Sequence, residues 1–183
     1  MDAIKSIRFE KIIKAVLIVL LGSALLTLSA KIKIPFYPVP MTMQTFVVLA
    51  LGISLGYKIG IATVGLYLIE GIAGLPVFAN SPEKGVGLIY FMGPTMGYLI
   101  GFLFAVYLSG YFNLKQNIFL IFLKLSISTS IIYIFGMLWL GSIIGWEKPI
   151  FALGAQPFLF AEIFKILILT LLTKSLLKFR KFI

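Results

Sequence analysis

Residues 117–141 read NIFLIFLKLSISTSIIYIFGMLWLG, a stretch of 25 residues in which Lys124 is the single charged side chain. A helix needs about 20 consecutive, predominantly apolar residues to cross a bilayer. This stretch meets that requirement and therefore predicts a membrane-spanning helix. It decides the fold class, because the remaining apolar runs of the chain can be interpreted on the same basis.

The composition extends this prediction to the whole chain. Of the 183 residues, 61% are hydrophobic and 12% are charged, and the mean hydropathy is +1.10. Soluble domains are roughly 45–50% apolar and roughly 25% charged. Six spans of about 20 residues would use about two-thirds of the chain. We therefore expect one integral membrane domain over residues 1–183, with little sequence left for a soluble domain.

Polar residues, prolines and glycines divide the apolar sequence into six candidate helices. Only Gly56-Tyr57-Lys58 separates the second candidate from the third, which predicts a tight hairpin there. The fold class is thus an all-α polytopic membrane protein with six transmembrane helices. They are expected at about 12–30, 42–56, 57–73, 92–112, 117–141 and 157–178.

The distribution of lysine and arginine predicts the orientation. With six spans, ten cations fall on the side of the termini: Lys5, Arg8, Lys11, Lys14, Lys58, Lys115, Lys174, Lys178, Arg180 and Lys181. Four fall on the other side: Lys31, Lys33, Lys84 and Lys148. Cytoplasmic loops carry the excess of positive charge. We therefore expect a multi-pass plasma-membrane protein whose N and C termini are both cytoplasmic.

The residue types that are missing limit the chemistry. The chain has no Cys and no His, which removes thiol nucleophiles, His-based triads and the commonest metal ligands. The net charge of +10 is explained by membrane topology rather than by nucleic-acid binding. We expect no metal and no cofactor in this chain, the lipid bilayer as its surroundings, and no nucleic-acid partner.

Unusual sequence collects on the predicted outer side. Residues 34–44 read IPFYPVPMTMQ, in which three prolines within six residues disfavour a helix. Thr42 and Gln44 then open the second span, GLPVFAN follows the third span up to Asn80, and GPTMGYL opens the fourth. The motifs therefore predict a functional site formed by the outer loops and the helix ends next to them.

Glu162 and Lys165 are the most informative pair. They are three residues apart and so share one face of the last helix, about one turn below its outer end. Charged side chains within a membrane are costly and usually face a cavity, a partner or the bundle interior. We expect them near the floor of an outward-open pocket, and a self-neutralising ion pair is the alternative. For Glu70, near the outer end of the third span, a site role and a surface role both remain open.

Five stretches stand in this order between residues 30 and 165: PVPMTMQT, YLIEGIAGLPVF, GPTMGYLIGF, YIFGMLWL and PFLFAEIFK. In sequence and in order they resemble the BioY family, the biotin-specific S components of energy-coupling factor (ECF) transporters. The resemblance implies the six-helix S-component fold, a vitamin pocket near the outer face and no catalysis by this subunit. It also implies that partner ATPases use ATP and act through a transmembrane T component.

The resemblance also implies the substrate-binding residues. Glu162 and Lys165 match the acidic residue and the lysine of the family's last motif, with Glu in place of the usual Asp. Asn80 lies where the family has a polar ligand contact, and Lys84 is the only cation between GLPVF and GPT. The further polar candidates are Thr42 and Gln44, and Tyr98, Tyr67 and Trp139 offer surface for the bicyclic ring of biotin.

Three alternatives remain open at this point. An S component for another vitamin, such as riboflavin or thiamine, would share the fold, but it should lack GLPVF and GPTMGYL. An intramembrane enzyme could use Glu162, Lys165 and Glu70 for acid–base chemistry, although no facing pair of aspartates accompanies them. A purely structural membrane protein would not need polar residues concentrated at one face. The oligomeric state, a homo-oligomer included, is left open.

Overall fold

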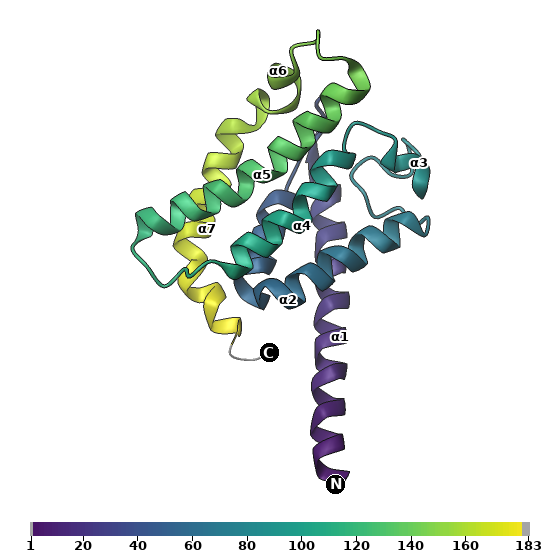
Figure 1. Cartoon of the computed structure of the whole chain (residues 1–183). Coiled ribbons are helices and arrows are strands. Elements are labelled where there is room, and N and C mark those ends of the chain that lie inside the picture. Colours follow the sequence, from purple (N-terminus) through teal and green to yellow (C-terminus); the bar gives the residue numbers. More distant parts are fainter. Residues whose placement is uncertain (1, 181–183) are drawn as a thin grey trace.

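The protein is an irregular bundle of long helices (Figure 1). The computed structural model describes the backbone of residues 2–180 and the side chains of residues 9–180. The long helices are α1 (Asp2–Lys31), α2 (Gln44–Ile72), α4 (Met96–Tyr111), α5 (Ile118–Ile144) and α7 (Leu159–Phe179). The short elements are β1 (Lys33–Ile34), β2 (Met41–Thr42), α3 (Leu88–Phe91), α6 (Ile150–Gly154) and the 3-10 helix η1 (Gln156–Phe158).

The predicted six-span bundle is recovered once α2 is divided. Four helical stretches are long and apolar enough to cross a membrane, at Phe9–Lys31, Gln44–Ile72, Ile118–Ile144 and Ile150–Phe179, and α4 is a shorter apolar helix. Gly56 lies within α2 at φ 76° and ψ 169°, outside helical geometry. A positive φ is strained for residues other than glycine. The chain turns sharply there (Figure 1), which confirms two separate helices meeting at Gly56.

The helix bounds differ from the predicted ones where prolines and glycines form outer turns. The fourth span begins at Met96 rather than at 92, because residues 92–95 form a turn after α3. The last span begins at Leu159 and is preceded by α6 and η1, with Pro157 in the first turn of η1. Two helices are longer than predicted, because α1 begins at Asp2 rather than at 12 and α5 ends at Ile144 rather than at 141. Local turn formation explains the first two differences, because a proline cannot donate a helical hydrogen bond.

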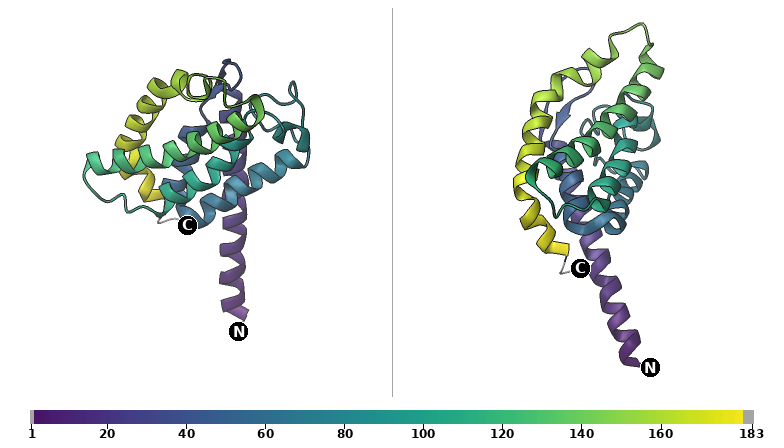
Figure 2. Two further views of the ribbon diagram at one scale, coloured as in Figure 1. Left: turned by 45° about the horizontal axis from the view of Figure 1, so that its top comes forward. Right: turned by 60° about the vertical axis from the view of Figure 1, so that its left-hand side comes forward.

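The helices pack around α2 and α4. Gly56 divides α2 into a first arm (residues 44–55) and a second arm (residues 57–72). Helix α2 contacts α1, α4 and α7, and α5 packs against α4 and α7 (Figure 2). Between α1 and α2, strands β1 and β2 pair antiparallel with Lys33 opposite Thr42 and Ile34 opposite Met41. This small ribbon folds the outer loop back over the bundle. It thereby brings residues 39–42 towards the helix ends.

Helices α4 and α5 approach each other through glycines of the GPTMGYLIGF motif. A Cβ added at Gly97 would lie 2.3 Å from the carbonyl oxygen of Phe135, and one at Gly101 would lie 2.7 Å from the Cα of Ile132. Both neighbours are backbone atoms, which cannot move aside without moving α5. Small residues allow this kind of close contact between membrane helices.

Gly97→Ala is therefore expected to destabilise the protein by about 1–3 kcal/mol, the usual cost of overpacking. The measurement is thermal unfolding of the purified protein in detergent. Gly65→Ala is the matched control, because nothing lies within 4 Å of a Cβ at Gly65, and alanine favours a helix over glycine. Equal melting temperatures for Gly97→Ala and the wild type would contradict this account of the α4–α5 contact.

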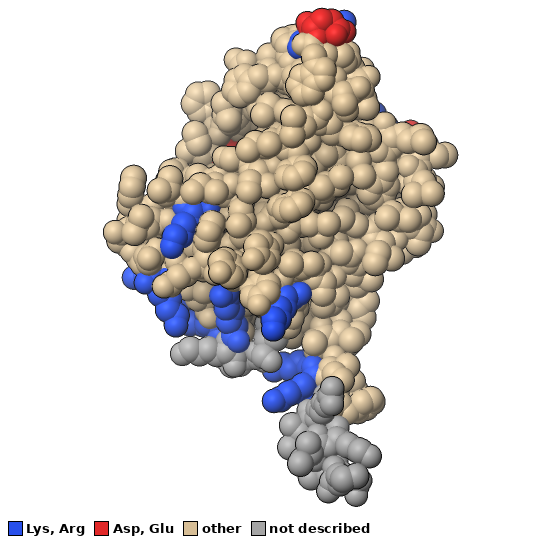
Figure 3. All heavy atoms as spheres, in the orientation of Figure 1, with Lys and Arg blue, Asp and Glu red and all other residues tan. Residues whose placement is uncertain are grey.

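Charge is distributed along the bundle as the positive-inside rule requires. Most of the visible basic side chains lie at the lower end of the bundle, whereas the clearest acidic patch lies at the opposite end, with basic atoms beside it (Figure 3). Arg180, after α7, connects this helix to α2 and α4. Its guanidinium donates to the carbonyls of Ile53 (2.6 Å), Gly52 (3.0 Å) and Gly110 (2.9 Å). Of the ten counted cations, Lys181 and the side chains of Lys5 and Arg8 lie outside the described residues.

Candidate ligand-binding pocket

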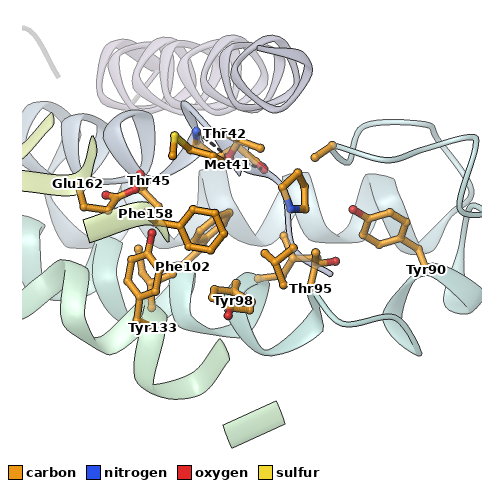
Figure 4. A pocket seen from close by; sticks show the side chains of 16 residues that line it. Met41, Thr42, Thr45, Tyr90, Thr95, Tyr98, Phe102, Tyr133, Phe158 and Glu162 are labelled. Atoms are coloured by element: carbon orange, nitrogen blue, oxygen red, sulfur yellow. Dashed lines mark hydrogen bonds between the residues drawn. The ribbon is translucent and has the colours of Figure 1, made fainter. Parts of the chain in front are cut away.

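A cavity with an empty volume of about 530 Å³ lies under the outer loop, between the ends of α2, α4, α5 and α7 (Figure 4). Its lining is mostly apolar and aromatic, with a few polar groups, as is usual for small-molecule sites. Glu162 and Thr45 lie at one end and Tyr90 at the other (Figure 4). The lining residues are Val39, Pro40, Met41, Thr42, Gln44, Thr45, Ala79, Tyr90, Thr95, Tyr98, Leu99, Phe102, Ile132, Tyr133, Phe158 and Glu162.

Glu162 provides the charged group of the pocket. Its side chain is buried, with 5% of its surface exposed, and it reaches the cavity from the first turn of α7. Oε1 accepts hydrogen bonds from Lys165 Nζ at 2.8 Å and from Thr45 Oγ1 at 2.9 Å. Among the described residues Oε2 has no hydrogen bond of normal geometry, and the hydroxyl of Tyr133 interacts with the same carboxylate. A buried acceptor without such a bond is costly, so this oxygen is a candidate contact for a ligand that donates a hydrogen bond.

Lys165 lies one turn further along α7, behind Glu162. Its ammonium group donates to Glu162 Oε1, to the backbone oxygen of Thr42 at 2.6 Å and to Thr45 Oγ1 at 3.1 Å. An ammonium group has three donors, and these three acceptors use all of them. The buried pair therefore connects α7 to the beginning of α2 and fixes the direction of the Glu162 carboxylate.

An aromatic wall faces this carboxylate. The ring of Tyr98, on α4, packs against Gly136 of α5, where an added Cβ would lie 2.3 Å from the ring. The Tyr98 hydroxyl donates to the carbonyl of Gly154 at 2.7 Å. Tyr133 meets Tyr98 edge to face, with ring centroids 5.9 Å apart, and points its hydroxyl towards the Glu162 end (Figure 4). Phe158 lies against Tyr133 with ring centroids 6.2 Å apart. These contacts hold the rings in place and provide flat, apolar surfaces for a ligand.

Gln44 and Tyr67 form a second layer of polar contacts. Gln44 lines the pocket at the beginning of α2, and its amide Nε2 donates to the Tyr67 hydroxyl at 2.7 Å. Tyr67 in turn donates to the carbonyl of Val77 at 3.2 Å. Tyr67 is fully buried behind the lining, so its role in this structure is to hold Gln44 and the loop that follows α2.

Asn80 lies beside a smaller neighbouring cavity rather than in the main one. This second cavity has an empty volume of about 250 Å³, is also lined by Lys84, and shares Tyr90 and Thr95 with the main pocket. Lys33 Nζ donates to the carbonyl of Ala79 at 2.8 Å and to Asn80 Oδ1 at 3.2 Å. Burial raises the pKa of Tyr90 above its ordinary value, so its hydroxyl remains neutral where the cavities meet.

Trp139 and Glu70 lie outside the pocket lining. The indole Nε1 of Trp139 donates to the carbonyl of Gly93 at 2.9 Å and holds the turn before α4. The Ser23 hydroxyl donates to Oε2 of Glu70, which links α1 to the second arm of α2. Of the eight predicted site residues, Thr42, Gln44, Tyr98 and Glu162 line the pocket. Lys165 and Tyr67 support it from behind, and Asn80 lines the adjoining cavity.

Several lining residues were missed by sequence reasoning. Thr45, Tyr133 and Phe158 belong to the quoted motifs PVPMTMQT, YIFGMLWL and PFLFAEIFK. The prediction chose other residues from these motifs, namely Thr42, Gln44, Trp139, Glu162 and Lys165. Tyr90 and Thr95 lie between motifs or at the start of one. An aromatic side chain in an apolar span carries no signal that separates a pocket wall from a lipid-facing surface. Proximity to a predicted polar residue was the one signal available, and it applied to Thr45.

Fold and pocket together define a class, namely a multi-pass membrane protein with a site for a small molecule near one face of the bilayer. The chain belongs to the BioY family, whose model matches residues 3–182. A Pyrococcus horikoshii protein named probable biotin transporter BioY is 36% identical over 152 residues, which cover 83% of this chain and 89% of the relative.

Two further matches agree with the family. The biotin transporter BioY of Thermotoga maritima is 34% identical over 157 residues, which cover 85% of this chain and 91% of the relative. A crystal structure described as the S-component for biotin from an ECF-type ABC transporter superposes with a TM-score of 0.75 at 25% identity, covering 92% of this chain and 93% of that one. The S-component fold predicted from the motifs is thereby confirmed.

Proposed function

We propose that this protein is the biotin-binding subunit of a vitamin uptake system. It binds biotin in the pocket near the outer face and delivers it inward together with a T component and ATPases that consume ATP. The subunit itself has no cofactor and carries out no reaction on the vitamin. The proposal is supported by the family and by the names of its relatives. The structural observation that carries it is Oε2 of Glu162, which lies at one end of an aromatic cavity without a hydrogen bond of normal geometry among the described residues.

The pocket favours one orientation of biotin. Biotin has a ureido group with two N–H donors at one end and a carboxylate at the other. Glu162 Oε2 can accept an N–H bond, and hydrogen bonds to a charged acceptor are stronger than neutral ones. The biotin carboxylate would instead be repelled by Glu162. The ureido ring therefore lies at the Glu162 end, with the bicycle against Tyr98, Tyr133 and Phe158.

In this orientation Lys165 positions the carboxylate of Glu162 and does not bind the tail of the vitamin. All three of its donors are already used by Glu162, Thr45 and the Thr42 carbonyl. The tail extends towards Tyr90, where the adjoining cavity offers Asn80 and Lys84. Lys84 is exposed, so its attraction for the tail carboxylate is weakened by water and salt.

The proposed function is tested by calorimetric titration of the purified protein with biotin, thiamine and riboflavin. Heat of binding is expected for biotin at concentrations at which the other two vitamins give none. The same titrations in a thermal-shift format should raise the melting temperature only with biotin, because a ligand that binds the folded state stabilises it. Equal responses to the three vitamins, or none to biotin, would overturn the proposal.

The position of the tail gives a separate prediction. Lys84→Met is expected to weaken biotin binding about two- to five-fold, the range for one exposed ion pair of up to about 1 kcal/mol. Biotinamide, which lacks the negative charge, should bind the wild type and the variant equally. Lys148→Met, at another outer lysine, is the control variant. A Lys84→Met variant that weakens biotin and biotinamide alike would show that Lys84 acts on the loop and not on the carboxylate.

A further inference from the structure

A hollow with an empty volume of about 840 Å³ lies between α7 and the loop that joins α4 to α5, at the end of the bundle where most of the visible basic side chains gather (Figure 3). Lys174, Leu177 and Lys178 of α7 form one side, and residues 114–116 of the loop form the other. The lining thus brings Lys115 together with two lysines that are far from it in the sequence. We call this feature the basic hollow.

The loop side of the basic hollow is held in place from within the bundle. Leu114 is buried and belongs to the apolar cluster against which Leu177 packs. Lys124 of α5 donates to the carbonyl of Asn113 at 2.8 Å and to Oε1 of Gln116. Because Gln116 uses its amide oxygen in this way, its amide nitrogen remains available as a donor. The loop therefore presents its lysine and an amide donor from a fixed backbone, above an apolar floor.

The lysines of the basic hollow are not neutralised by the protein. Among residues 9–180, the ammonium groups of Lys115, Lys174 and Lys178 have neither a hydrogen bond nor an ion pair, and no carboxylate is among the residues that line the hollow. Lys174 and Lys178 are four residues apart on one helix face, a spacing at which like charges repel. An anion in the hollow would relieve this repulsion and accept charge-assisted hydrogen bonds.

The position of the basic hollow favours an anion that also has an apolar part. The lysines of α7 lie in the last turns of a membrane-spanning stretch, and Leu171, which shares a helix face with Lys174 and Lys178, is 70% exposed. Ile118 and Phe119, directly after the loop, are exposed as well. Cations and lipid-facing apolar side chains thus adjoin here, at the end that the charge distribution places on the cytoplasmic side.

We propose that the basic hollow binds the phosphate headgroup of an anionic phospholipid from the cytoplasmic leaflet. The phosphate lies among the three lysines, with the Gln116 amide as a further donor, and an acyl chain runs along the exposed side chain of Leu171. Basic pockets between transmembrane helices on this side of a membrane bind such headgroups. The inference assigns a second ligand site, at the opposite end of the bundle from the vitamin pocket, and goes beyond the proposed binding of biotin.

The test is thermal unfolding of the full-length protein in lipid-free detergent, titrated with short-chain phosphatidylglycerol, short-chain phosphatidylcholine, inorganic phosphate or a hexaglutamate peptide. A ligand that binds the folded state raises the melting temperature. Phosphatidylglycerol is expected to do so at a concentration several-fold lower than any of the other three probes. Native mass spectrometry of the protein in an equal mixture of the two lipids should show phosphatidylglycerol as the retained adduct.

Matched double variants locate the effect. In Lys115→Gln, Lys178→Gln the preference for phosphatidylglycerol over phosphatidylcholine should fall about five- to twenty-five-fold, since one lysine beside an anionic headgroup contributes about five-fold in affinity. Lys11→Gln, Lys58→Gln is the control, because it removes the same charge from exposed lysines outside the hollow. Both variants should melt close to the wild-type temperature without lipid, which shows that they fold.

Four outcomes would overturn the proposal. Equal responses to the two lipids would indicate only a general lipid shell, and an equal loss in both double variants would indicate only the net charge of this end. Inorganic phosphate as effective as phosphatidylglycerol would show a site for a soluble anion, and a stronger response to hexaglutamate would show a site for an acidic protein segment. Because no vitamin is present, these results are independent of the calorimetric test of biotin binding.

Discussion

Glu162→Gln is expected to weaken biotin binding about 10- to 100-fold. Glutamine keeps the shape of the side chain but removes the charge that strengthens the hydrogen bond from the ureido group. Hydrogen bonds to charged groups contribute about 1.5–3 kcal/mol, and each 1.4 kcal/mol changes the affinity about tenfold. Calorimetric titration of both proteins with biotin measures the difference directly.

Glu162→Asp is the matched control for this prediction. It retains the charge and shortens the side chain by one methylene, so binding should remain stronger than in Glu162→Gln. An unchanged dissociation constant in Glu162→Gln would mean that the carboxylate serves only the ion pair with Lys165. The ligand contact assigned to Oε2 would then be wrong.

Lys165→Met is expected to reduce the stability of the folded protein by about 3–5 kcal/mol, because it leaves the buried Glu162 carboxylate without its cation. Biotin binding should weaken as well, since Oε1 and Oε2 are no longer held in their present direction. The measurements are thermal unfolding in detergent and calorimetric titration. Lys174→Met, in the last turns of the same helix and exposed, is the control and should change neither property.

The double variant Glu162→Gln, Lys165→Met separates the two effects of the pair. With neither charge buried, most of the stability lost in Lys165→Met should return, because a neutral replacement of a buried pair is often tolerated. The affinity for biotin should stay low, because no charged acceptor remains. A double variant as unstable as Lys165→Met alone would contradict the assignment of the stability loss to an uncompensated carboxylate.

The membrane fold was largely predictable from sequence, for reasons that particular elements illustrate. The run 117–141 is predominantly apolar and has one charged residue, so its length indicated a span, and α5 covers Ile118–Ile144. The break at Gly56-Tyr57-Lys58 was visible because glycine and a charged residue interrupt an apolar run. The start of α4 at Met96 was not, because the turn over residues 92–95 follows α3, which the sequence did not reveal.

The site was predictable where charge marked it. Glu162 and Lys165 stand out in an apolar helix, and their spacing of three predicted a shared face. The ion pair between Lys165 Nζ and Glu162 Oε1 at 2.8 Å confirms it. The roles of the aromatic residues were not predictable. Tyr133 faces the pocket because α5 packs against α4 at Gly97, Gly101 and Gly136, and Trp139 on the same helix holds Gly93 instead. Such directions depend on the packing between helices and not on local sequence.

The central claim is that biotin lies in this pocket with its ureido ring against Glu162. A structure of the protein with biotin bound, at a resolution that places the ring, is the most direct test. The account predicts a ureido nitrogen within about 3 Å of Glu162 Oε2, a hydrogen-bonding distance, and a tail directed towards Tyr90. A ring at the Tyr90 end with the carboxylate near Lys165, or biotin bound outside the cavity, would contradict it.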